Sequence, residues 1–275
     1  MRPGSENIGA TRPPPLVLIT GAASGIGRAL AQAYATQGAR LALCDIDPRG
    51  LAAVASQIAT PCHLATLDVA DAPAVETFAQ AILATTGVPD ILVNNAGIAL
   101  IKPFLQTGAA EWQRVMDVNL GGAVHVTRAF LPAMLAAGGA RRIVNVASLA
   151  GLVAGRELSA YCAGKHALIG FSDALALELA GSDVGITLVC PGLVNTGILD
   201  PLDDPRKAAW QTLAAKYGTP PETIARAIVA AVARNQARVH PGRGALFWPA
   251  LQRLSPALTR RLILALTARQ RETAP

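Results

Sequence analysis

Short apolar runs alternate with longer segments of helical periodicity along most of the chain. Runs with the length and composition of buried strands occur at residues 16–20, 40–45, 62–67, 90–93, 142–147, 185–190 and 237–240. Helical segments occur between them at residues 25–37, 48–59, 72–86, 109–137, 159–180 and 220–234. Because strands separated by crossover helices form right-handed βαβ units, this alternation predicts a parallel sheet.

The alternation has no break that would separate two domains, so we predict a single α/β domain at residues 15–245. Runs such as LVLIT and ILVNN are apolar at nearly every position, which is typical of strands covered by helices on both faces. We therefore expect a doubly wound sheet of about seven strands. Residues 1–14 are predicted to be a disordered tail, residues 196–219 a substrate lid over the carboxyl edge of the sheet, and residues 246–275 a helical extension.

The composition favours a large aliphatic core. Of the 275 residues, 52% are hydrophobic, 15% are charged and only 4% are aromatic. Such a core is built mainly from Ala, Val, Leu and Ile, which suits helices packed on a buried sheet. The formal net charge of +6 comes from scattered arginines rather than from a basic run interleaved with aromatic residues. We therefore expect no nucleic-acid partner.

The cysteines and histidines do not form a metal-binding pattern. Cys44, Cys62, Cys162 and Cys190 form no CxxC pair, and the histidines lack metal-ligand spacing. We expect no metal, buried free thiols and a reducing cytoplasmic location. The first residues lack the apolar segment of a signal peptide, and no uncharged apolar stretch is long enough to span a membrane.

A glycine-rich loop, TGAASGIG at residues 20–27, connects the first predicted strand to the first predicted helix. Its glycines allow a tight turn and let backbone N–H groups approach a pyrophosphate, while the helix N-terminus adds partial positive charge. A plain glycine turn is the alternative. The position after the first strand, the following helix and an acidic residue at the end of the second strand together favour a dinucleotide site. A Walker-type loop is excluded because no Lys follows the glycines.

The acidic residue is Asp45, which ends the second predicted strand. A carboxylate there can accept hydrogen bonds from the adenosine ribose and repels a 2′-phosphate, so we expect NAD(H) rather than NADP(H). Capping of the next helix is the alternative role, although Asp47 is better placed for it. Arg28 and Arg40 are the residues that could instead favour the phosphate.

Tyr161 and Lys165 lie four residues apart on one face of a predicted helix. Reduction of a ketone leaves an alkoxide that needs a proton, and oxidation of an alcohol needs a base. A phenol, with a pKa of about 10, becomes a better base when a nearby ammonium lowers that pKa. Ser148 follows the fifth predicted strand and can hydrogen-bond the substrate oxygen. The set predicts hydride-transfer chemistry with Tyr161 as the acid and base.

Taken together, these motifs resemble those of the short-chain dehydrogenase/reductase superfamily, in its compact single-domain branch, over about residues 15–240. The motifs that carry the resemblance are TGAASGIG (20–27), Asp68-Val69, NNAG (94–97), Asn119 in VNLGG, Ser148, YCAGK (161–165) and PGLVNT (191–196). The resemblance implies a Rossmann fold and the NAD(P)-dependent interconversion of a secondary alcohol and a ketone.

The resemblance also implies a role for each matching position. Tyr161 is implied as the general acid and base, Lys165 as the group that lowers its pKa and holds the nicotinamide ribose, and Ser148 as the ligand of the substrate oxygen. Asn119 is implied to anchor a water molecule in a proton relay. The implied cofactor-binding residues are Gly21, Ser24, Gly25, Ile26, Gly27, Asp45, Ile46, Asp68, Val69, Asn95, Ala96, Gly97, Tyr161, Lys165, Pro191, Gly192, Val194 and Thr196.

Within that set, Asp68 and Val69 would bracket the adenine, and Val194 and Thr196 would hold the carboxamide. Three positions keep an alternative role that is only structural. Asn119 could hydrogen-bond backbone within its helix, Asp68 could cap the following helix, and Thr196 could cap the lid.

The segment from 251 to 271 has leucines at helical spacing with arginines around them. Such a helix can lie on a membrane surface, but we favour docking on the domain or at a subunit interface. The resemblance further implies a homodimer or homotetramer built through the helices at 109–137 and 159–180.

We therefore expect an NAD(H)-dependent alcohol dehydrogenase or ketoreductase. An NADP(H)-preferring ketoreductase and a catalytically silent NAD(H)-binding sensor or scaffold are the alternatives. An apolar alcohol or ketone is the expected substrate, because the residues expected to form the pocket walls are Ala99, Leu100, Leu149, Val153, Leu158, Leu193, Ile198, Leu199 and Trp210.

Overall fold

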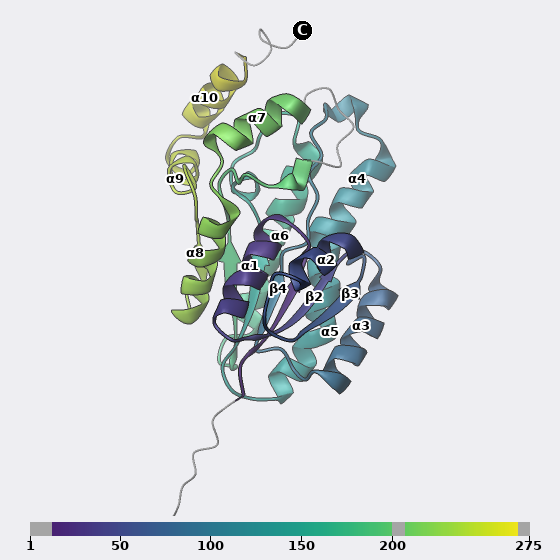
Figure 1. Ribbon diagram of the computed structural model, residues 1–275. Helices are drawn as coiled ribbons and strands as arrows, with labels where there is room; N and C mark the ends of the chain where they lie inside the picture. The colour runs from purple at the N-terminus through teal and green to yellow at the C-terminus, as the bar shows by residue number, and fades with distance from the viewer. Residues whose placement is uncertain (1–12, 200–206, 269–275) are drawn as a thin grey trace, which may run out of the picture.

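A computed structural model of the chain describes residues 13–199 and 207–268. Its centre is a seven-stranded sheet in the order β3-β2-β1-β4-β5-β6-β7, and every neighbouring pair of strands is parallel. The strands are β1 (Leu16–Thr20), β2 (Arg40–Asp45), β3 (Cys62–Thr66), β4 (Ile91–Asn94), β5 (Arg141–Val146), β6 (Val184–Val189) and β7 (Arg238–Val239). The prediction of a doubly wound parallel α/β sheet is confirmed (Figure 1).

The helices cover both faces of the sheet. They are α1 (Gly25–Thr36), α2 (Pro48–Ala55), α3 (Ala72–Thr85), α4 (Ala109–Met116), α5 (Gly122–Ala136), α6 (Ser159–Glu178), α7 (Lys207–Tyr217), α8 (Pro221–Ala233), α9 (Phe247–Leu254) and α10 (Pro256–Ala268), with short 3-10 turns η1 (Phe104–Gln106), η3 (Leu149–Gly151) and η4 (Gly197–Leu199).

Successive residues of the strands point into two different cores because side chains alternate across a sheet. In β1, Leu16 and Leu18 pack with α3, α5 and α6, whereas Val17 and Ile19 pack with α1, α2 and α8. Both sets are fully buried. This explains why the strand runs are apolar at nearly every position and show no polar face.

The strand order reverses between β1 and β4, which are neighbours in the sheet although two strands separate them in sequence. The chain builds outward to β3 on one side of this point and to β7 on the other. In open α/β sheets, the chain leaves the two strands at such a point in opposite directions. The loops that follow these strands therefore diverge and form a crevice at the carboxyl ends of the strands. The glycine loop after β1 and the NNAG segment after β4 both lie at this position.

The predicted helix at 109–137 is instead α4 and α5 joined by a π-helical segment, η2 (Asp117–Gly121). The widened turn places Gly122 directly against Val69, where a Cβ atom on Gly122 would lie 2.5 Å from the Val69 Cγ2 atom. Helical periodicity alone does not detect an inserted residue of this kind, and such π segments are frequent at functional sites.

The predicted C-terminal helical extension consists of two helices rather than one. They meet at Ser255, whose backbone is not helical and whose Oγ atom accepts a hydrogen bond from the Leu258 N–H at 3.4 Å. Pro256 opens α10, at the position where a missing N–H costs nothing.

Parts of the predicted tail, lid and extension lie outside the described residues, namely 1–12, 200–206 and 269–275. Within the described ranges, no helix is both long enough and apolar enough to cross a lipid bilayer.

The core that α3 and α5 form on one face of the sheet can be tested at Phe130. Its side chain is fully buried and packs edge-on against Phe78, with the ring centroids 6.1 Å apart. We expect Phe130→Ala to lower the free energy of unfolding by about 3–5 kcal/mol in chemical denaturation. Leu105→Ala is the control, because Leu105 is 94% exposed. Its effect should be about 1 kcal/mol or less, and equal losses for both variants would contradict this packing.

Candidate active site

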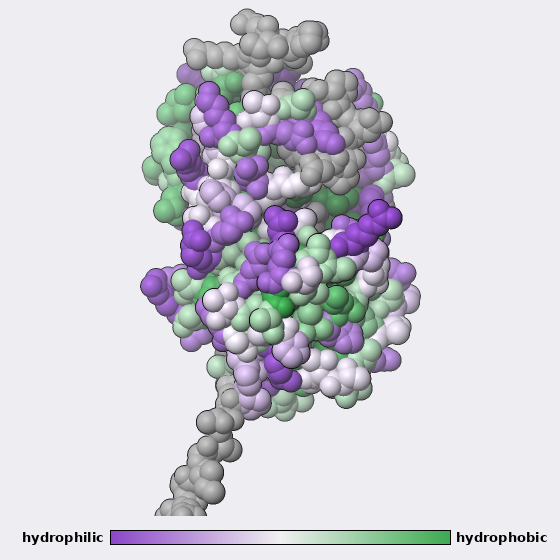
Figure 2. Space-filling model, viewed as in Figure 1, coloured by the Kyte–Doolittle hydropathy of each residue, from purple (hydrophilic) through white to green (hydrophobic). Residues whose placement is uncertain are grey.

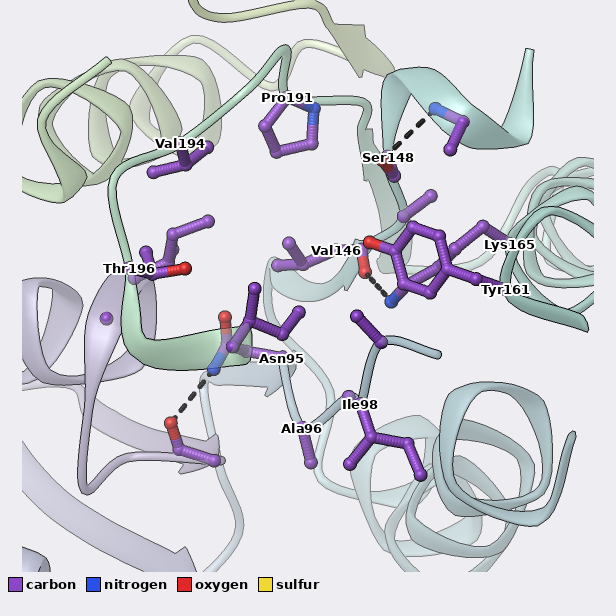
Figure 3. A pocket seen from close by; sticks show the side chains of 18 of the residues that line it. Asn95, Ala96, Ile98, Val146, Ser148, Tyr161, Lys165, Pro191, Val194 and Thr196 are labelled. Carbon is purple, nitrogen blue, oxygen red and sulfur yellow. Dashed lines mark hydrogen bonds between the residues drawn. The ribbon is translucent and has the colours of Figure 1, made fainter. Parts of the chain in front are cut away.

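A cleft of about 610 Å³ opens at the carboxyl ends of the strands. Its lining comes from the loops after β1, β2, β3, β4, β5 and β6 and from helices that are distant in sequence. Figure 3 shows Asn95, Ser148, Tyr161, Lys165 and Thr196 around it. The cleft therefore collects most of the positions that the sequence motifs single out.

The glycine loop runs along one wall of this cleft. Gly21 has a φ of +65°, a conformation that a side chain disfavours, and a Cβ atom on Gly27 would collide with the Gly21 carbonyl oxygen. The loop leads into α1, whose N-cap residue Ser24 makes no capping hydrogen bond through its side chain. The first turn of α1 therefore keeps backbone N–H groups that a bound anion can satisfy.

Asn95 fastens the glycine loop to the end of β4. Its Nδ2 atom donates to the carbonyl oxygens of Thr20 and Gly21, both at 3.0 Å. The Thr20 hydroxyl in turn accepts from the N–H groups of Asn95 and Ala96, each at 3.0 Å. Asn95 was expected to line the cleft, and it does so while also holding the turn in shape (Figure 3).

Asp45 and Ile46 lie on the wall of the cleft at the end of β2. The Asp45 carboxylate accepts hydrogen bonds from the Ala23 N–H at 2.9 Å and from the Asp47 N–H at 3.0 Å. Capping of α2 falls to Asp47, which accepts from the Arg49 N–H at 3.0 Å. Asp45 thus ties β2 to the glycine loop and is not the cap of α2.

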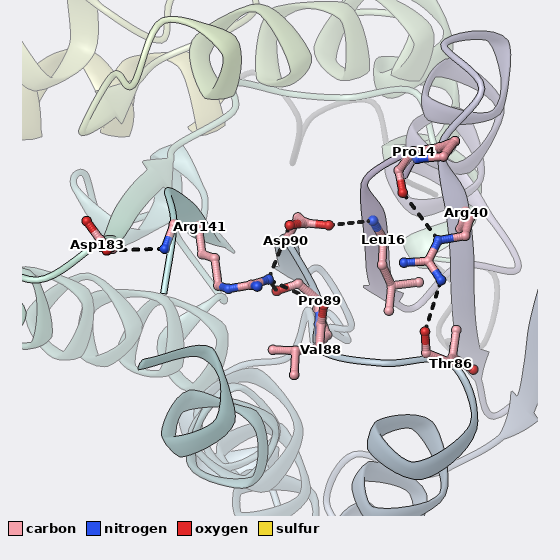
Figure 4. Close-up of polar contacts among 10 residues, drawn as sticks. Pro14, Leu16, Arg40, Thr86, Val88, Pro89, Asp90, Arg141 and Asp183 are labelled. Carbon is pink, nitrogen blue, oxygen red and sulfur yellow. Dashed lines mark hydrogen bonds and ion pairs between the residues drawn. The ribbon is translucent and has the colours of Figure 1, made fainter. Parts of the chain in front are cut away.

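The two arginines that could have favoured a 2′-phosphate do not line the cleft. Arg40 begins β2, at the opposite end of the strand from Asp45, and donates to the carbonyl oxygens of Pro14 at 3.2 Å and Thr86 at 3.0 Å (Figure 4). Arg28 is exposed on α1.

Asp68 forms a polar contact that the sequence does not reveal. Its Oδ1 atom accepts from the Ala70 N–H at 3.0 Å, and its Oδ2 atom pairs with Arg114 of α4 at 2.8 Å. The cap of α3 is Asp71 rather than Asp68, through a bond from the Ala74 N–H. Arg114 also lines the cleft, and no motif points to it because it reaches the site only through the fold.

Ser148, Tyr161 and Lys165 come together at the middle of the cleft, where β5 ends and α6 begins. The Lys165 Nζ atom donates to the Val146 carbonyl oxygen at 3.0 Å and lies 5.9 Å from the centre of the Tyr161 ring. The Ser148 hydroxyl accepts from the Ala150 N–H at 3.1 Å. Figure 3 shows the Tyr161 hydroxyl pointing into the cleft.

Burial dominates the ionisation of this group. It raises the pKa of Tyr161 above its usual value, while the Ser148 side chain acts in the opposite direction. Burial also lowers the pKa of Lys165 to about 8. The sequence predicts a lowered phenol pKa, and for this structure that direction is wrong. The reason is that the phenolate loses more hydration than its neighbours replace.

Asn119 lies in the π segment, 1% exposed, and does not line the cleft. Its Nδ2 atom donates to the Ile98 carbonyl oxygen at 2.9 Å, and its Oδ1 atom accepts from the Ile98 N–H at 3.0 Å. Asn119 therefore does hydrogen-bond backbone, as its alternative role proposed, but the backbone is that of Ile98 in the segment after β4 rather than that of its own helix. Gly97 lies between Asn119 and Lys165. A Cβ atom on Gly97 would lie 2.9 Å from the Asn119 Oδ1 atom and 3.2 Å from the Lys165 Nζ atom, so no side chain fits at this position.

The loop after β6 closes the cleft opposite the start of α6 and meets the glycine loop. A Cβ atom on Gly25 would lie 3.0 Å from the Thr196 Cγ2 atom. The Pro191 carbonyl oxygen accepts from the Leu149 N–H at 2.7 Å, which joins this loop to the segment after β5. The expected residues Pro191, Gly192, Val194 and Thr196 all line the cleft.

Apolar side chains line much of the rest. Of the expected wall residues, Ala99, Leu149, Val153, Leu158, Leu193 and Ile198 line the cleft. Leu100 does not, and the side chains of Leu199 and Trp210 lie outside the described residues. Trp248 of α9 and Ile263 of α10 complete this wall. The sequence pattern missed both, because it shows an amphipathic helix without showing where its inner face packs.

The part of the chain that the structure describes contains no cluster of three His, Cys, Asp or Glu side chains that could hold a metal ion. Cys44, Cys62, Cys162 and Cys190 are free thiols.

The family model described as short chain dehydrogenase matches residues 15–207. The chain is 41% identical over 235 residues to a protein of Mycobacterium tuberculosis (strain ATCC 25618 / H37Rv) called "Probable oxidoreductase EphD". That match covers 80% of this chain but only 40% of the relative, so the chain spans less than half the length of that protein. It is also 39% identical over 219 residues to D-threitol dehydrogenase of Mycolicibacterium smegmatis, covering 78% of this chain and 84% of the relative.

Solved structures of the same kind superpose on this fold. A short chain dehydrogenase/reductase from Burkholderia phymatum in complex with NAD matches with a TM-score of 0.84 and 29% identity, covering 89% of this chain and 95% of that one. An actinorhodin polyketide ketoreductase with NADPH matches with a TM-score of 0.77 and 29% identity, covering 86% of this chain and 98% of that one. Structures similar to this chain thus bind NAD in one case and NADPH in the other.

The cost of the buried ammonium can be measured with Lys165→Met. Lys165 is 3% exposed and its pKa is lowered to about 8, so at neutral pH the folded protein holds a charge that water does not hydrate. We expect the variant without cofactor to melt at a higher temperature than the wild type below about pH 8, because Met fills a similar volume without charge.

The difference should shrink as the pH rises above that value. The unfolded-state pKa of Lys, about 10.4, lies above the folded value, so the unfolded wild type binds more protons between the two and wild-type stability rises with pH there. Scanning calorimetry at a series of pH values measures this, with the exposed Lys216→Met as the control. A variant that melts below the wild type at neutral pH would contradict the assigned cost.

Proposed function

The chain belongs to the short-chain dehydrogenase/reductase family, and from this premise we propose that it transfers a hydride between NAD(H) and an apolar secondary alcohol or ketone. The observation that carries the proposal is the placement of the Tyr161 hydroxyl in a cleft that Ser148 also lines, beside the buried Lys165. The wall that faces them carries the glycine loop.

The residues on that wall fit a dinucleotide. The N–H groups at the start of α1 receive no hydrogen bond from a capping side chain. Gly27 packs so closely on Gly21 that neither position has room for a side chain, so the backbone of the loop faces the cleft directly. These groups would hold the pyrophosphate, Asp45 the adenosine ribose, and Asp68 with Val69 the adenine. Lys165 would hold the nicotinamide ribose, and Val194 and Thr196 the carboxamide. When bound, the nicotinamide supplies or accepts the hydride.

The chain's own part in the reaction is proton transfer at the substrate oxygen. In reduction, Tyr161 gives its hydroxyl proton to that oxygen, and in oxidation its phenolate takes the proton away. The Ser148 hydroxyl orients the oxygen. Because burial favours the neutral phenol, the protonated form is ready for reduction, whereas oxidation gains from alkaline pH.

Lys165, on the cleft wall, and Asn119, behind that wall, support this step. The Lys165 charge, 5.9 Å from the phenol ring centre, stabilises the phenolate when it forms. The side-chain amide of Asn119 bonds both the N–H and the carbonyl oxygen of Ile98. These two bonds fix the position of the neighbouring Gly97, which packs against Lys165. A water molecule anchored near Asn119 remains a prediction.

The preference for NAD(H) rests on Asp45. Its carboxylate is held on the cleft wall by two backbone N–H groups, so it cannot swing away from a 2′-phosphate without breaking them. Arg40 bonds backbone at the other end of β2 and offers no compensating charge. Arg114 already pairs with Asp68.

An apolar substrate follows from the wall near Tyr161. Its members are aliphatic or aromatic and include Val153, Leu158, Ile198, Trp248 and Ile263. A polar polyol would leave its hydroxyl groups without partners on such a surface, and that costs binding free energy. An apolar alcohol, by contrast, has only the reacting hydroxyl to satisfy, and the rest of it can pack against this wall.

We further propose a homo-oligomer built through α4, α5 and α6. Leu135 of α5 is 45% exposed and Leu177 of α6 is 79% exposed, so both helices present apolar side chains for a partner. The free thiols fit a reducing cytoplasm.

The central test is Tyr161→Phe, which removes the transferred proton while keeping the ring. We expect kcat for oxidation of secondary alcohols to fall by roughly 100-fold to 10,000-fold. The ultraviolet absorbance of reduced nicotinamide measures the rate across a panel of alcohols and ketones. Binding of NADH, followed by fluorescence, should remain because the hydroxyl is not needed to hold the pyrophosphate or adenine.

Tyr217→Phe is the matched control, since Tyr217 is 49% exposed at the end of α7. It should keep wild-type turnover. If Tyr161→Phe retained more than about a tenth of wild-type kcat, proton transfer by Tyr161 would have to be abandoned.

Asp45→Asn tests the cofactor preference separately. Removing the charge should lower the ratio of kcat/KM with NADH to kcat/KM with NADPH by about tenfold or more, which corresponds to about 1.4 kcal/mol. Asp71→Asn, which alters only the cap of α3, is the control and should leave the ratio unchanged. A wild-type enzyme that prefers NADPH would be the contrary result.

A further inference from the structure

Helices α9 and α10 carry a large exposed apolar surface, which we call the C-terminal apolar surface. Its members are Leu246, Phe247, Leu254, Leu258, Leu262 and Leu266. Their exposed fractions run from 37% at Leu262 to 83% at Leu254. Figure 2 shows apolar surface along the upper left edge of the molecule, where Figure 1 places α9.

The inner faces of the same helices are already occupied. Thr259 is fully buried, and Trp248 and Ile263 line the cleft. Leu258, Leu262 and Leu266 follow one another at intervals of four residues and form a separate stripe on α10. Docking of α9 and α10 on the domain, which the sequence favours, therefore accounts for the inner face and leaves this stripe in contact with solvent.

The charged side chains of α9 and α10 are all arginines. No Asp or Glu occurs between Glu222 and Glu272. Arg253, Arg260 and Arg261 are exposed on α9 and α10, and within the described chain no carboxylate pairs with any of them. By contrast, Arg238 pairs with Asp173 at 2.6 Å. The apolar surface is therefore edged by guanidinium groups that have no acidic partner on those helices.

This combination discriminates between possible occupants. A second copy docked face to face would bring the same arginines together, because a twofold interface pairs a surface with itself. An anionic bilayer meets both features, since leucines can enter the boundary of the acyl chains while arginines bind lipid phosphates. We propose that α9 and α10 bind the surface of an anionic membrane through the C-terminal apolar surface.

The placement of the cleft gives this binding a consequence. Trp248 lines the cleft while its neighbour Phe247 is 58% exposed, and Ile263 lines it while Leu262 and Leu264 are exposed. One layer of helix thus separates the cleft from the proposed membrane. An apolar alcohol dissolved in the bilayer would have a short route to Tyr161. This link to the substrate rests on the proposed function, whereas membrane binding itself does not.

Vesicle sedimentation of the full chain tests the proposal. The protein is mixed with vesicles of phosphatidylcholine and phosphatidylglycerol, or of phosphatidylcholine alone, and the pelleted fraction is measured. We expect binding to the anionic vesicles that weakens with salt and is much lower on the neutral ones. The triple variant Arg253→Gln, Arg260→Gln, Arg261→Gln should partition roughly 100-fold more weakly.

A second triple variant removes the apolar stripe through Leu258→Ser, Leu262→Ser and Leu266→Ser, and it should also lose binding. The control replaces three exposed apolar residues outside both the C-terminal helices and the proposed oligomer contact, through Leu64→Ser, Phe104→Ser and Leu105→Ser, and should pellet like the wild type. An unchanged circular dichroism spectrum shows that each variant is folded, and because this readout does not depend on NADH, it keeps a failed membrane interaction distinct from a failed enzyme assignment.

Three results would overturn the proposal. One is a wild type that does not pellet with anionic vesicles, and another is a control that loses as much binding as the two surface variants. Alternatively, light scattering without lipid could show that the leucine variant has a smaller mass than the wild type, which would assign the surface to a second copy of the chain.

Discussion

Seven strands that all run in one direction bring their carboxyl ends to one edge of the sheet, and the site depends on that constraint. The reversal of strand order between β1 and β4 opens a crevice there, so the loops after six strands line one cleft. The fold thereby places a glycine loop from the first tenth of the chain opposite a tyrosine more than halfway along it. Asn95 joins the two halves at this point by bonding the backbone of Thr20 and Gly21.

The chemistry in the middle of the cleft depends on polar groups that are removed from water. A buried chain of hydrogen bonds holds α6 to the sheet beneath the site. Asn94 donates to Asn145 at 2.8 Å, and Asn145 donates to the Ser172 hydroxyl at 2.9 Å. Lys165 lies on the same helix and is anchored to the end of β5. Burial favours the neutral forms of both Tyr161 and Lys165. The protonation states of the two side chains therefore depend on the charges of the molecules that bind in the cleft.

Periodicity and motifs predicted the strands to within about a residue at most ends, because buried parallel strands and crossover helices leave strong local patterns. They also identified the glycine loop, Asp45 and the Tyr161–Lys165 pair, whose chemistry is encoded in short segments. Other features depend on tertiary packing. The π segment that contains Asn119 brings Gly122 against Val69, and Arg114, Trp248 and Ile263 reach the cleft only through the fold. The direction of the Tyr161 pKa also escaped prediction, since burial cannot be read from spacing four residues apart.

The central claim is that the Tyr161 hydroxyl is the proton donor and acceptor beside a bound nicotinamide. A crystal structure of the chain with NAD and an unreactive alcohol analogue tests it most directly. We expect the pyrophosphate at the start of α1, the nicotinamide ring against Lys165 and the loop after β6, and the analogue's oxygen within hydrogen-bond distance of Tyr161 and Ser148. A nicotinamide ring bound away from Tyr161, with Lys165 turned towards solvent, would contradict the account.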